Sequence, residues 1–361
     1  MLGYNRKQNR LEKAGGILKF LHIADIHWGA RPDRDKSWGI IREKEIKETF
    51  QRVIDYANEH QIDLLLISGD FFHQLPSYQE VREVDYLLSK LLNTKTVWIA
   101  GNHDHLTENN SLSNYPFQSD TVLLKGPSME KVYFKDLETT VYGFSYWTDQ
   151  IAKPLYDDIH PTQKDGIHIL LAHGGDQTHI PISREKLKWS GFDYIALGHI
   201  HKPEIIFEDL MAYAGSLEPI EKTETGRHGF IEGEITEEKQ IIRFVPFARR
   251  RYEDLEINIS EDMSGEEILD LVETEIRNYG EDNIYQIFFY GTKDPMVQLD
   301  FECLMEKYYI LQIQFHVDSQ WDYEVLSKED NLLIQNIAEL LKNEPEALEY
   351  AMEALSVSRE N

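Results

Sequence analysis

Five short polar patterns in this 361-residue chain each follow an apolar run that reads as a strand, and they hold residue types that can bind metal ions. IADIH and SGD supply two aspartates and a histidine, whereas AGNHDH, LLAHGG and LGHIH supply further histidines, an asparagine and an aspartate. In an α/β sheet, sites assemble in the loops outside the carboxyl ends of strands, so these side chains are expected to converge. The residues concerned are Asp25, His27, Asp70, Asn102, His103, Asp104, His173, His199 and His201.

This combination of side chains indicates a centre of two metal ions. Imidazole and carboxylate together suit Mn, Fe or Zn, whereas ligation by oxygen alone would favour Mg or Ca. One aspartate must bridge the two ions to hold them roughly 3.5–4 Å apart. Such a pair clamps the oxygens of a phosphate group and lowers the pKa of a bridging water, and the resulting hydroxide attacks phosphorus in line. The pattern therefore predicts hydrolysis of a phosphoester.

The elements that must position these loops alternate through the first 245 residues. Residues 17–24 read as a buried strand, and apolar residues at helical spacing predict a helix over 43–59. Ser77 and Glu80 form the capping box of a further helix. The other predicted strands are 62–68, 96–100, 132–137, 140–146, 167–172, 193–197, 229–235 and 241–247. The prediction is a layered α/β domain, with sheet on sheet or sheet between helices.

Composition changes at residues 247–255, FARRRYEDL. The three arginines either contact phosphate or form a solvated junction between domains, and the junction is favoured because charge runs are usually exposed. A small α/β domain is predicted after them. Its elements are a strand over 252–258, a helix opened by Ser264 and Glu267, a strand over 284–290, a short helix near 301–308 and a strand over 310–317.

The chain from Glu329 onward reads as two helices broken near Pro345. The first is predicted to have one apolar face and the second another. These faces either pack on the small domain or bind the helices of another protein, and the pattern leaves both open. The predicted faces are Leu333, Ile337, Leu340 and Leu341 in the first helix, and Leu348, Met352 and Leu355 in the second.

The net charge of −27 is unfavourable for general nucleic-acid binding, which needs a basic face. Residues 251–361 carry 7 basic and 27 acidic side chains, whereas the first 250 carry 30 and 37. Two bound divalent cations would offset part of the charge of the first 250 residues. The acidity therefore belongs mostly to the last third of the chain, and it does not decide against a nucleic-acid substrate.

Other features concern the location of the protein. Cys303 is the single cysteine, so there is no internal disulfide, in keeping with a reducing cytoplasm. No apolar run approaches the length of a membrane span. The N-terminal residues 1–16 are basic and polar without the apolar region of a secretory signal, and they are expected to be a disordered extension or an upstream start.

With its motifs D-x-H, G-D, G-N-H-D, H and G-H-x-H, the stretch from about 17 to 246 resembles the calcineurin-like metallophosphoesterase superfamily. The resemblance implies a four-layer α/β/β/α sandwich. It implies that Asp70 bridges the two metals and that His103 stabilises the transition state or protonates the leaving oxygen, with Asp104 orienting His103. It further implies that Asp25, His27, Asp70 and His201 bind one metal, and that Asp70, Asn102, His173 and His199 bind the other.

The pattern GDFFH bears on the substrate. Phosphatases of phosphoproteins typically have G-D-x-x-D-R-G and G-N-H-E, whereas this chain has His73 in place of the second aspartate and no arginine after it. GDFFH is similar to the nuclease subunit of the bacterial SbcCD complex, where that histidine contributes to nuclease chemistry. The stretches 194–203, 213–230 and 247–257 resemble the YhaO-like branch of the same family.

The resemblance thus implies a Mn²⁺-dependent DNA exo/endonuclease subunit that works in DNA repair with an SMC-like coiled-coil ATPase and dimerises through its catalytic domain. Fe, Zn or Mg could replace Mn. The expected domains are a catalytic domain over 17–246, a capping domain over 247–328 and a partner-docking helical segment over 329–361. The alternatives are a phosphoesterase of small substrates, such as cyclic nucleotides or phosphomonoesters, and a non-catalytic adaptor.

The remaining histidines are expected to have ordinary roles. His22 and His168 fall inside predicted strands, which favours core or edge positions. His105 follows the G-N-H-D motif closely enough to touch substrate, although an ordinary loop position fits equally well. His60, His160, His179, His228 and His316 have no spacing typical of metal ligands.

Overall fold

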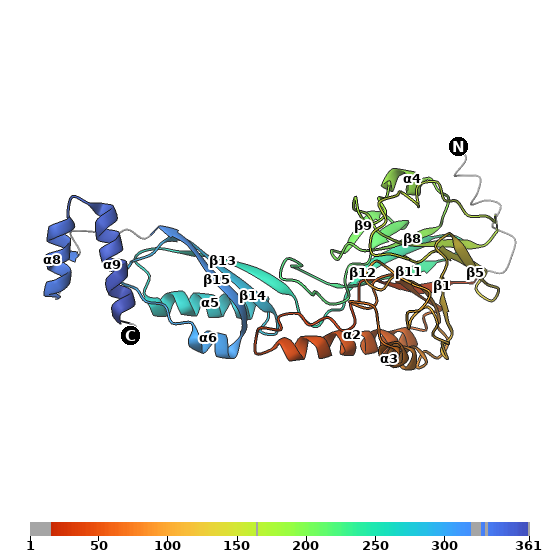
Figure 1. Ribbon diagram of the computed structural model, residues 1–361, viewed down its shortest axis with the longest axis horizontal. Helices are drawn as coiled ribbons and strands as arrows, with labels where there is room; N and C mark the ends of the chain where they lie inside the picture. The colour runs from red at the N-terminus through yellow and green to blue at the C-terminus, as the bar shows by residue number, and fades with distance from the viewer. Residues whose placement is uncertain (1–15, 164, 319–325, 329–330, 360–361) are drawn as a thin grey trace. The chain divides into compact units, whose positions relative to one another are not determined.

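The computed structural model describes residues 16–163, 165–318, 326–328 and 331–359. The chain divides into two compact units, one ending at Tyr252 and the other beginning at Glu253 (Figure 1). The predicted N-terminal extension lies outside the described residues, apart from Gly16. The expected domain boundaries at 246 and 328 stay predictions. In the described part of the chain, no helix is both long enough and apolar enough to cross a membrane.

The first unit contains two six-stranded sheets. The first sheet has the order β12-β11-β1-β2-β3-β4, in which β1 to β4 are parallel, β11 is antiparallel to β1, and β12 is antiparallel to β11. Its strands are β1 (Leu18–Ile23), β2 (Leu64–Ser68), β3 (Lys95–Ile99), β4 (Thr121–Leu123), β11 (Gly229–Ile235) and β12 (Gln240–Pro246).

The second sheet has the order β5-β6-β7-β8-β10-β9. Its four central strands are parallel, and the edge strands β5 and β9 are antiparallel to their neighbours. The strands are β5 (Glu130–Phe134), β6 (Thr139–Gly143), β7 (Ile167–His173), β8 (Tyr194–Gly198), β9 (Glu204–Phe207) and β10 (Met211–Tyr213). The short strands β4, β9 and β10 were not predicted from the sequence.

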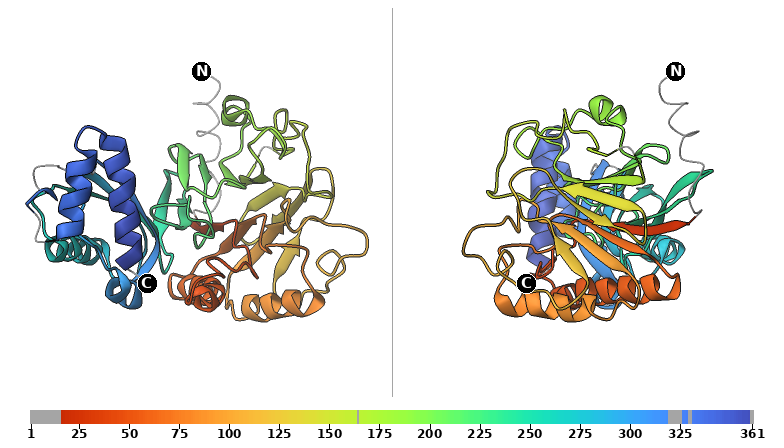
Figure 2. Two further views of the ribbon diagram at one scale, coloured as in Figure 1. Left: turned by 60° about the vertical axis from the view of Figure 1, so that its left-hand side comes forward. Right: turned by 90° about the vertical axis from the view of Figure 1, so that its right-hand side faces the viewer.

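Strand β2 shows why the sheets pack as layers. Leu64 and Leu66 belong to the core between the two sheets, whereas Leu65 and Ile67 belong to the core on the other face. Successive side chains point to opposite faces of a strand, so an unbroken apolar run is typical of a strand buried on both sides. Helices α2 (Gly39–Glu59) and α3 (Tyr78–Leu88) cover that other face (Figure 2).

The outer face of the second sheet is covered differently. Leu170 and Ala172 of β7 pack there with Tyr156 from a loop and Leu187 from the one-turn helix α4 (Arg184–Lys188). This outer layer is therefore built from loops and one short helix. The predicted α/β fold class, a sandwich with two sheets at its centre, is confirmed. The capping box of Ser77 and Glu80 at the start of α3 is also present.

The predicted exposure of the arginine run is wrong for Arg250. This side chain is buried, and its Nε lies 2.7 Å from Oε1 of Glu45 on α2. Arg42, also on α2, is fully buried and contacts the other oxygen of Glu45 at 2.6 Å and the carbonyl of Pro219 at 2.7 Å. A buried carboxylate recruits a nearby arginine because an unpaired charge would be costly there. The end of the first unit is thus attached to α2 by ion pairs.

The second unit begins with a three-stranded sheet of order β13-β14-β15. Ser264 and Glu267 form the predicted capping box of α5, and the buried face of this helix packs on the sheet. The elements are β13 (Tyr252–Ile259), α5 (Gly265–Tyr279), β14 (Ile284–Thr292), α6 (Glu302–Lys307) and β15 (Tyr309–Asp318).

Helices α8 (Leu332–Leu341) and α9 (Pro345–Arg359) follow, separated near Pro345 as predicted. The predicted face of α9 packs inward, whereas the predicted face of α8 is partly packed and partly exposed. Ile334 and Ala338 are buried there, whereas Leu333 and Leu340 are 54% and 82% exposed. The sequence LLIQNIAELL has apolar residues all round the helix, so only the packing against α9 selects the inward stripe.

Candidate metal centre

The loops that follow β1 and β2 run side by side. The backbone N–H groups of Asp25, His27 and Trp28 donate to the carbonyls of Gly69, Asp70 and Phe71, at 3.1, 3.1 and 2.7 Å. Asp25, His27 and Asp70 all have positive φ, between 49° and 50°. Non-glycine residues adopt this conformation rarely, and strained residues of this kind are found repeatedly at active sites. The backbones of the two loops are thus hydrogen-bonded to each other, and the residues that carry the polar side chains adopt a strained conformation.

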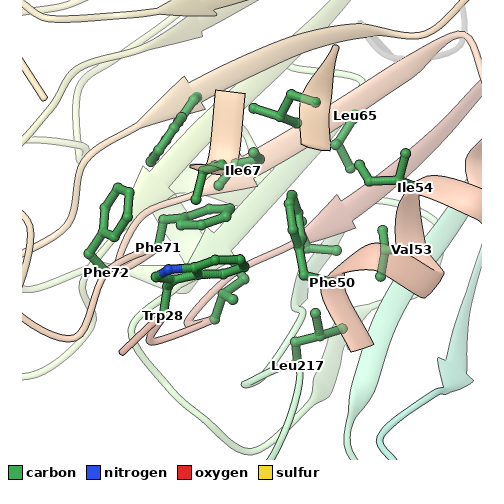
Figure 3. Close-up of a cluster of buried hydrophobic side chains, with 14 of the residues drawn as sticks. Trp28, Phe50, Val53, Ile54, Leu65, Ile67, Phe71, Phe72 and Leu217 are labelled. Atoms are coloured by element: carbon green, nitrogen blue, oxygen red, sulfur yellow. The ribbon is translucent and has the colours of Figure 1, made fainter. Parts of the chain in front are cut away.

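Aromatic side chains anchor these loops in the core under α2. Trp28 follows His27, and Phe71 and Phe72 follow Asp70; all three aromatic side chains are buried. Phe50 of α2 packs edge-on against the rings of Trp28 and Phe71, with centroid distances of 6.2 and 4.9 Å (Figure 3). Well-packed aromatic neighbours hold functional groups in place because they leave few alternative rotamers.

The structure brings the seven predicted metal ligands into two adjoining clusters. The donor atoms of Asp25, His27 and His201 lie within 4.8 Å of one another, and so do those of Asp70, His173 and His199. Nε2 of His27 lies 3.0 Å from Nε2 of His201. In the second cluster, Oδ1 of Asn102 lies 3.0 Å from Nε2 of His173 and 3.2 Å from Nδ1 of His199. The backbone N–H of His199 donates to Asp25 and so links the clusters.

His173 shows how the backbone chooses a ligand nitrogen. Its Nδ1 lies 2.8 Å from the carbonyl oxygen of Ser68, which can only accept, so Nδ1 carries the hydrogen and Nε2 is left to face Asn102. The ring is closely enclosed: a Cβ added at Gly69 would collide with it, and a Cβ added at Gly198 would collide with the carbonyl oxygen of Ser68 that the ring contacts. These two positions in SGD and LGH therefore require glycine.

Burial and neighbouring charges shift the pKa values of these groups in opposite directions. Burial lowers the pKa of His27 well below its usual range. Burial would lower the pKa of His173 too, but the charge of Asp70 outweighs this and raises it to about 9. In turn, His173 outweighs the effect of burial on Asp70 and lowers the pKa of that carboxyl. Burial also raises the pKa of Asp25 to about 6. Metal ions would have to displace the protons that these histidines and aspartates bind.

His73 and His103 lie beside the first cluster. Nδ1 of His73 lies 3.4 Å from Nδ1 of His27, and its ring stacks on that of His103 with centroids 5.6 Å apart. Nδ1 of His103 lies 2.9 Å from the carbonyl oxygen of His73. The expected contact of Asp104 with the His103 ring is not found: its carboxylate instead accepts the N–H groups of Gly101, Phe71 and Phe72. Asp104 is fully buried and links the loops that follow β2 and β3 through these hydrogen bonds.

A pocket of about 340 Å³ adjoins these histidines. Its lining includes His73, Asn102 and His103, together with His105 and His179. His179, which was expected to have an ordinary role, thus lies at the pocket, and its role stays a prediction. The pocket is formed by loops from both sheets, and sequence spacing within one loop could not reveal this.

Two carboxylates at the centre were missed from the sequence. Oδ2 of Asp176 lies 2.7 Å from Nε2 of His199, and Oε1 of Glu224 lies 2.7 Å from Nδ1 of His201. Asp176 follows LLAHGG directly, a position that could have marked it. Glu224 stands in an irregular segment, and no spacing connects it with His201.

The donor set fits a pair of divalent cations. Buried carboxylates and imidazoles converge with nitrogen and oxygen atoms close together, which is unfavourable unless protons or cations separate them. The mixture of nitrogen and oxygen donors is suited to Mn, Fe or Zn. A family model described as calcineurin-like phosphoesterase matches residues 18–203, just over half of the chain and all of the motifs named above.

The chain belongs to the calcineurin-like phosphoesterase family. The predicted family is thereby confirmed, and with it a phosphoester hydrolase superfamily whose members use divalent metals. The identity of the metals and the role of each residue stay predictions.

Several curated members of the family are similar in sequence. An uncharacterized metallophosphoesterase, YhaO of Bacillus subtilis, is 26% identical over 233 residues, which cover 59% of this chain and 56% of YhaO. The DNA double-strand break repair protein Mre11 of Methanocaldococcus jannaschii is 30% identical over 219 residues, 57% of this chain and 58% of that protein. Mre11 of Saccharolobus solfataricus is 29% identical over 217 residues, 55% and 54% of the two chains.

The chain spans about half the length of the curated relatives it matches. Among solved structures, GAP50, the anchor in the inner membrane complex of Plasmodium, is 12% identical and covers 64% of this chain and 85% of its own, with a TM-score of 0.36. That likeness is too weak to support an argument.

Proposed function

We propose that the chain is a metal-dependent DNA exo/endonuclease subunit of a DNA repair complex. The observation that carries this proposal is the placement of His73: beside the metal clusters, stacked on His103 and lining the same pocket. Phosphatases of phosphoproteins have an aspartate at the position of His73. The relatives named Mre11 are DNA double-strand break repair proteins, which supports DNA as the substrate.

Two metals would share the ligands as follows. Asp70 would be held by both metals, because it belongs to the second cluster and also lies near enough to His27 of the first for the charge of His27 to lower its pKa, and Mn²⁺ is the proposed ion. When bound, the metals would polarise the phosphodiester and activate water. The first metal would be held by Asp25, His27, Asp70 and His201, and the second by Asp70, Asn102, His173 and His199.

His103 is the proposed catalytic histidine. Its Nδ1 donates to the carbonyl of His73, so Nε2 is the nitrogen that can take up or release a proton. The side chain is exposed and lines the pocket, where it can reach a scissile phosphodiester. Protonated His103 would stabilise charge on the phosphoryl oxygens or protonate the leaving oxygen, and His73 stacked beside it would contact the substrate.

The proposed partner is an SMC-like coiled-coil ATPase that binds helices α8 and α9. Leu332, Leu333 and Leu340 of α8 are 75%, 54% and 82% exposed, and Tyr350 of α9 is 73% exposed. Large exposed apolar side chains on a helix pair are typical of a surface that docks another protein. A homodimer through the catalytic domain is proposed from the family resemblance alone.

The proposal is tested by hydrolysis assays with Mn²⁺ on single-stranded DNA, double-stranded DNA, a cyclic nucleotide and a chromogenic phosphomonoester. DNA cleavage is expected, and His103→Ala should reduce it by about 10²–10⁴-fold, the usual contribution of general acid–base catalysis. His60→Ala is the matched control, because His60 is exposed at the end of α2 and does not line the pocket.

The outcomes distinguish the candidate functions. Cleavage of DNA that depends on His103 but not His60 supports the nuclease. Hydrolysis of the small substrates alone would overturn it in favour of a small-substrate phosphoesterase. Parallel assays with Mg²⁺, Zn²⁺ and Fe²⁺ test the choice of Mn²⁺, which is wrong if another ion gives the highest rate.

A further inference from the structure

The two histidines of the GHIH pattern turn opposite ring nitrogens toward the metal clusters. His201 places Nε2 3.0 Å from Nε2 of His27, whereas His199 places Nδ1 3.2 Å from Oδ1 of Asn102. The backbone accounts for part of the difference, because φ of His199 is 95°, but a backbone angle does not select which ring nitrogen carries the hydrogen. Something beyond the pattern must hold each ring in its own orientation.

In both cases the other ring nitrogen contacts a carboxylate. Nδ1 of His201 lies 2.7 Å from Oε1 of Glu224, and Nε2 of His199 lies 2.7 Å from Oδ2 of Asp176. An ionised carboxylate can only accept, so the facing nitrogen must carry the hydrogen. The opposite nitrogen then keeps its lone pair for a metal ion. A carboxylate behind a histidine in this way fixes its tautomer and orientation and strengthens it as a ligand.

Glu224 is held firmly enough for this role. Its second oxygen, Oε2, accepts the backbone N–H of Ile220 at 2.9 Å and the hydroxyl of Ser216 at 3.1 Å. Nε2 of His228 lies 3.1 Å from the carbonyl oxygen of Glu224, and His228 is buried. The Glu224 side chain is only 10% exposed. Side chain and backbone are therefore both fixed before a metal binds.

Asp176 is organised by its own turn. Its Oδ1 accepts the N–H groups of Thr178 and His179, at 2.7 and 2.8 Å, while Oδ2 faces His199. Oδ2 also lies 2.8 Å from Nδ1 of His179, so one oxygen serves a candidate ligand and a pocket histidine. The Asp176 side chain is 43% exposed, much more than that of Glu224.

We propose that Glu224 and Asp176 are positioning residues that decide which nitrogen each histidine offers: Nε2 of His201 to the first metal and Nδ1 of His199 to the second. This inference rests on the two-metal site of the proposed function and adds to it the residues that preorganise the site. Glu224 has the larger effect, because water can replace an exposed carboxylate such as Asp176 more readily than a buried one.

The test is calorimetric titration of the metal-free full chain with Mn²⁺, which needs no DNA. The wild type should bind two ions. Glu224→Ala should weaken one of them by about 10–100-fold, the usual cost of removing such a partner, and leave the other nearly unchanged. The Mn²⁺ affinity of Glu224→Gln should lie between those of the wild type and Glu224→Ala, because the amide oxygen still accepts from Nδ1 of His201 but carries no charge. Asp176→Ala should weaken the other ion by a smaller factor.

Matched controls separate positioning from general electrostatics and from folding. Glu221→Gln removes an exposed charge from the same segment as Glu224, and Asp158→Asn removes a charge that is 94% exposed; both should bind Mn²⁺ like the wild type. Circular dichroism of each metal-free variant checks the fold. The absorption spectrum of the Co²⁺-substituted protein should change in Glu224→Ala and not in Glu221→Gln.

Three results would overturn the inference. Wild-type affinity in Glu224→Ala refutes the role of Glu224. A third ion in the wild type that is lost in Asp176→Ala would make Asp176, His179 and His199 a metal site of their own. Binding of no Mn²⁺ by the wild type refutes the inference and the two-metal site together. If the wild type binds two ions, Glu224→Ala loses more affinity than Glu224→Gln and Asp176→Ala, and DNA is not cleaved, the positioning roles stand and the nuclease proposal fails.

Discussion

The candidate metal centre and the charged cluster around Arg42 both bury ionisable groups within the first unit. Around Arg42, each charge meets an opposite one: Glu45 contacts Arg42 at 2.6 Å and Arg250 at 2.7 Å. At the metal centre, the carboxylate of Asp70 instead contacts the ring of His173 at 3.3 Å and the backbone N–H of His103 at 2.8 Å. Its partners are imidazoles, which are neutral unless they take up a proton.

The difference separates a structural network from a functional one. Arginine stays charged in any environment, so the carboxylates of the Arg42 cluster are paired without a metal ion, and the cluster ties the end of the first unit to α2. Histidine and aspartate can exchange their protons for metal ions, and their loops are left open to a pocket. Burial of charge alone therefore does not identify a site; the type of counter-charge does.

The strongest test of this comparison is Asp70→Asn, which removes the proposed bridging charge. Hydrolytic activity should fall by more than about 10³-fold, beyond the loss typical of one transition-state contact. Tight Mn²⁺ binding should be lost as well, while the metal-free fold is retained. Phosphoesterase assays and Mn²⁺ titration measure both effects. Asp158→Asn, at a 94% exposed position, is the control, and an Asp70→Asn variant that still binds two ions tightly would show that Asp70 does not bridge.

The opposite pattern is expected for Arg42→Met. Removal of the guanidinium leaves Glu45 and Glu218 buried without this partner, which should reduce the free energy of unfolding by about 3–5 kcal/mol. Mn²⁺ affinity of the folded protein should not change, because the cluster does not contain metal ligands. Urea unfolding followed by tryptophan fluorescence measures the first quantity, and calorimetry the second.

Arg31→Met is the matched control for Arg42. Arg31 pairs with Glu43 at 3.0 Å, but its side chain is 71% exposed, so its loss should cost less than about 1 kcal/mol. If Arg42→Met were no more destabilising than Arg31→Met, the cluster would not stabilise the fold. If it weakened Mn²⁺ binding, the division between the two regions would be wrong.

His22 provides a third case, a fully buried titratable group that forms no ion pair within the described part of the chain. Its Nδ1 lies 2.8 Å from the hydroxyl of Tyr194, and burial lowers its pKa from 6.5 to about 3. Between these two pKa values the unfolded chain binds a proton that the folded chain does not, so stability falls as the pH falls from about 6.5 toward 3. The loss should reach about 2 kcal/mol between pH 7 and pH 5.

His22→Gln is expected to abolish that part of the pH dependence. Urea unfolding of the wild type and the variant at pH 7, 6 and 5 gives the slope of the free energy of unfolding against pH for each protein. The difference between the two slopes is the contribution of His22, because the contributions of the titratable groups common to both proteins cancel. Parallel slopes would mean that His22 takes up a proton in the folded state.

Much of the candidate site could be predicted from the sequence because the strands and their ends are local features. Leu64 to Ile67 are apolar without interruption, which indicates a strand buried on both faces, and Asp70 follows directly. His199 and His201 follow β8 in the same way. The order of the strands, and hence the grouping of these residues into two clusters, came instead from the family resemblance.

The groups that sequence reasoning missed or misjudged depend on contacts between distant segments. Glu224 is 23 residues from His201 along the chain, and nothing in its neighbourhood distinguishes it from the many other acidic residues. Arg250 belongs to a run that reads as exposed, and only its contact with Glu45, 205 residues away, reveals that it is buried. Leu340 belongs to an all-round apolar helix, and packing on α9 decides that it faces solvent.

The sequence by itself determined which residues could act as metal ligands, since the type of a side chain and its position at the end of a strand are local features of the sequence. The tertiary structure alone decided which nitrogen each histidine presents, which carboxylate stands behind it and which charges are neutralised by arginine. The physical reason is that hydrogen bonds and ion pairs act over a few ångströms of space, whereas their partners here are separated by 23 to 205 residues of chain.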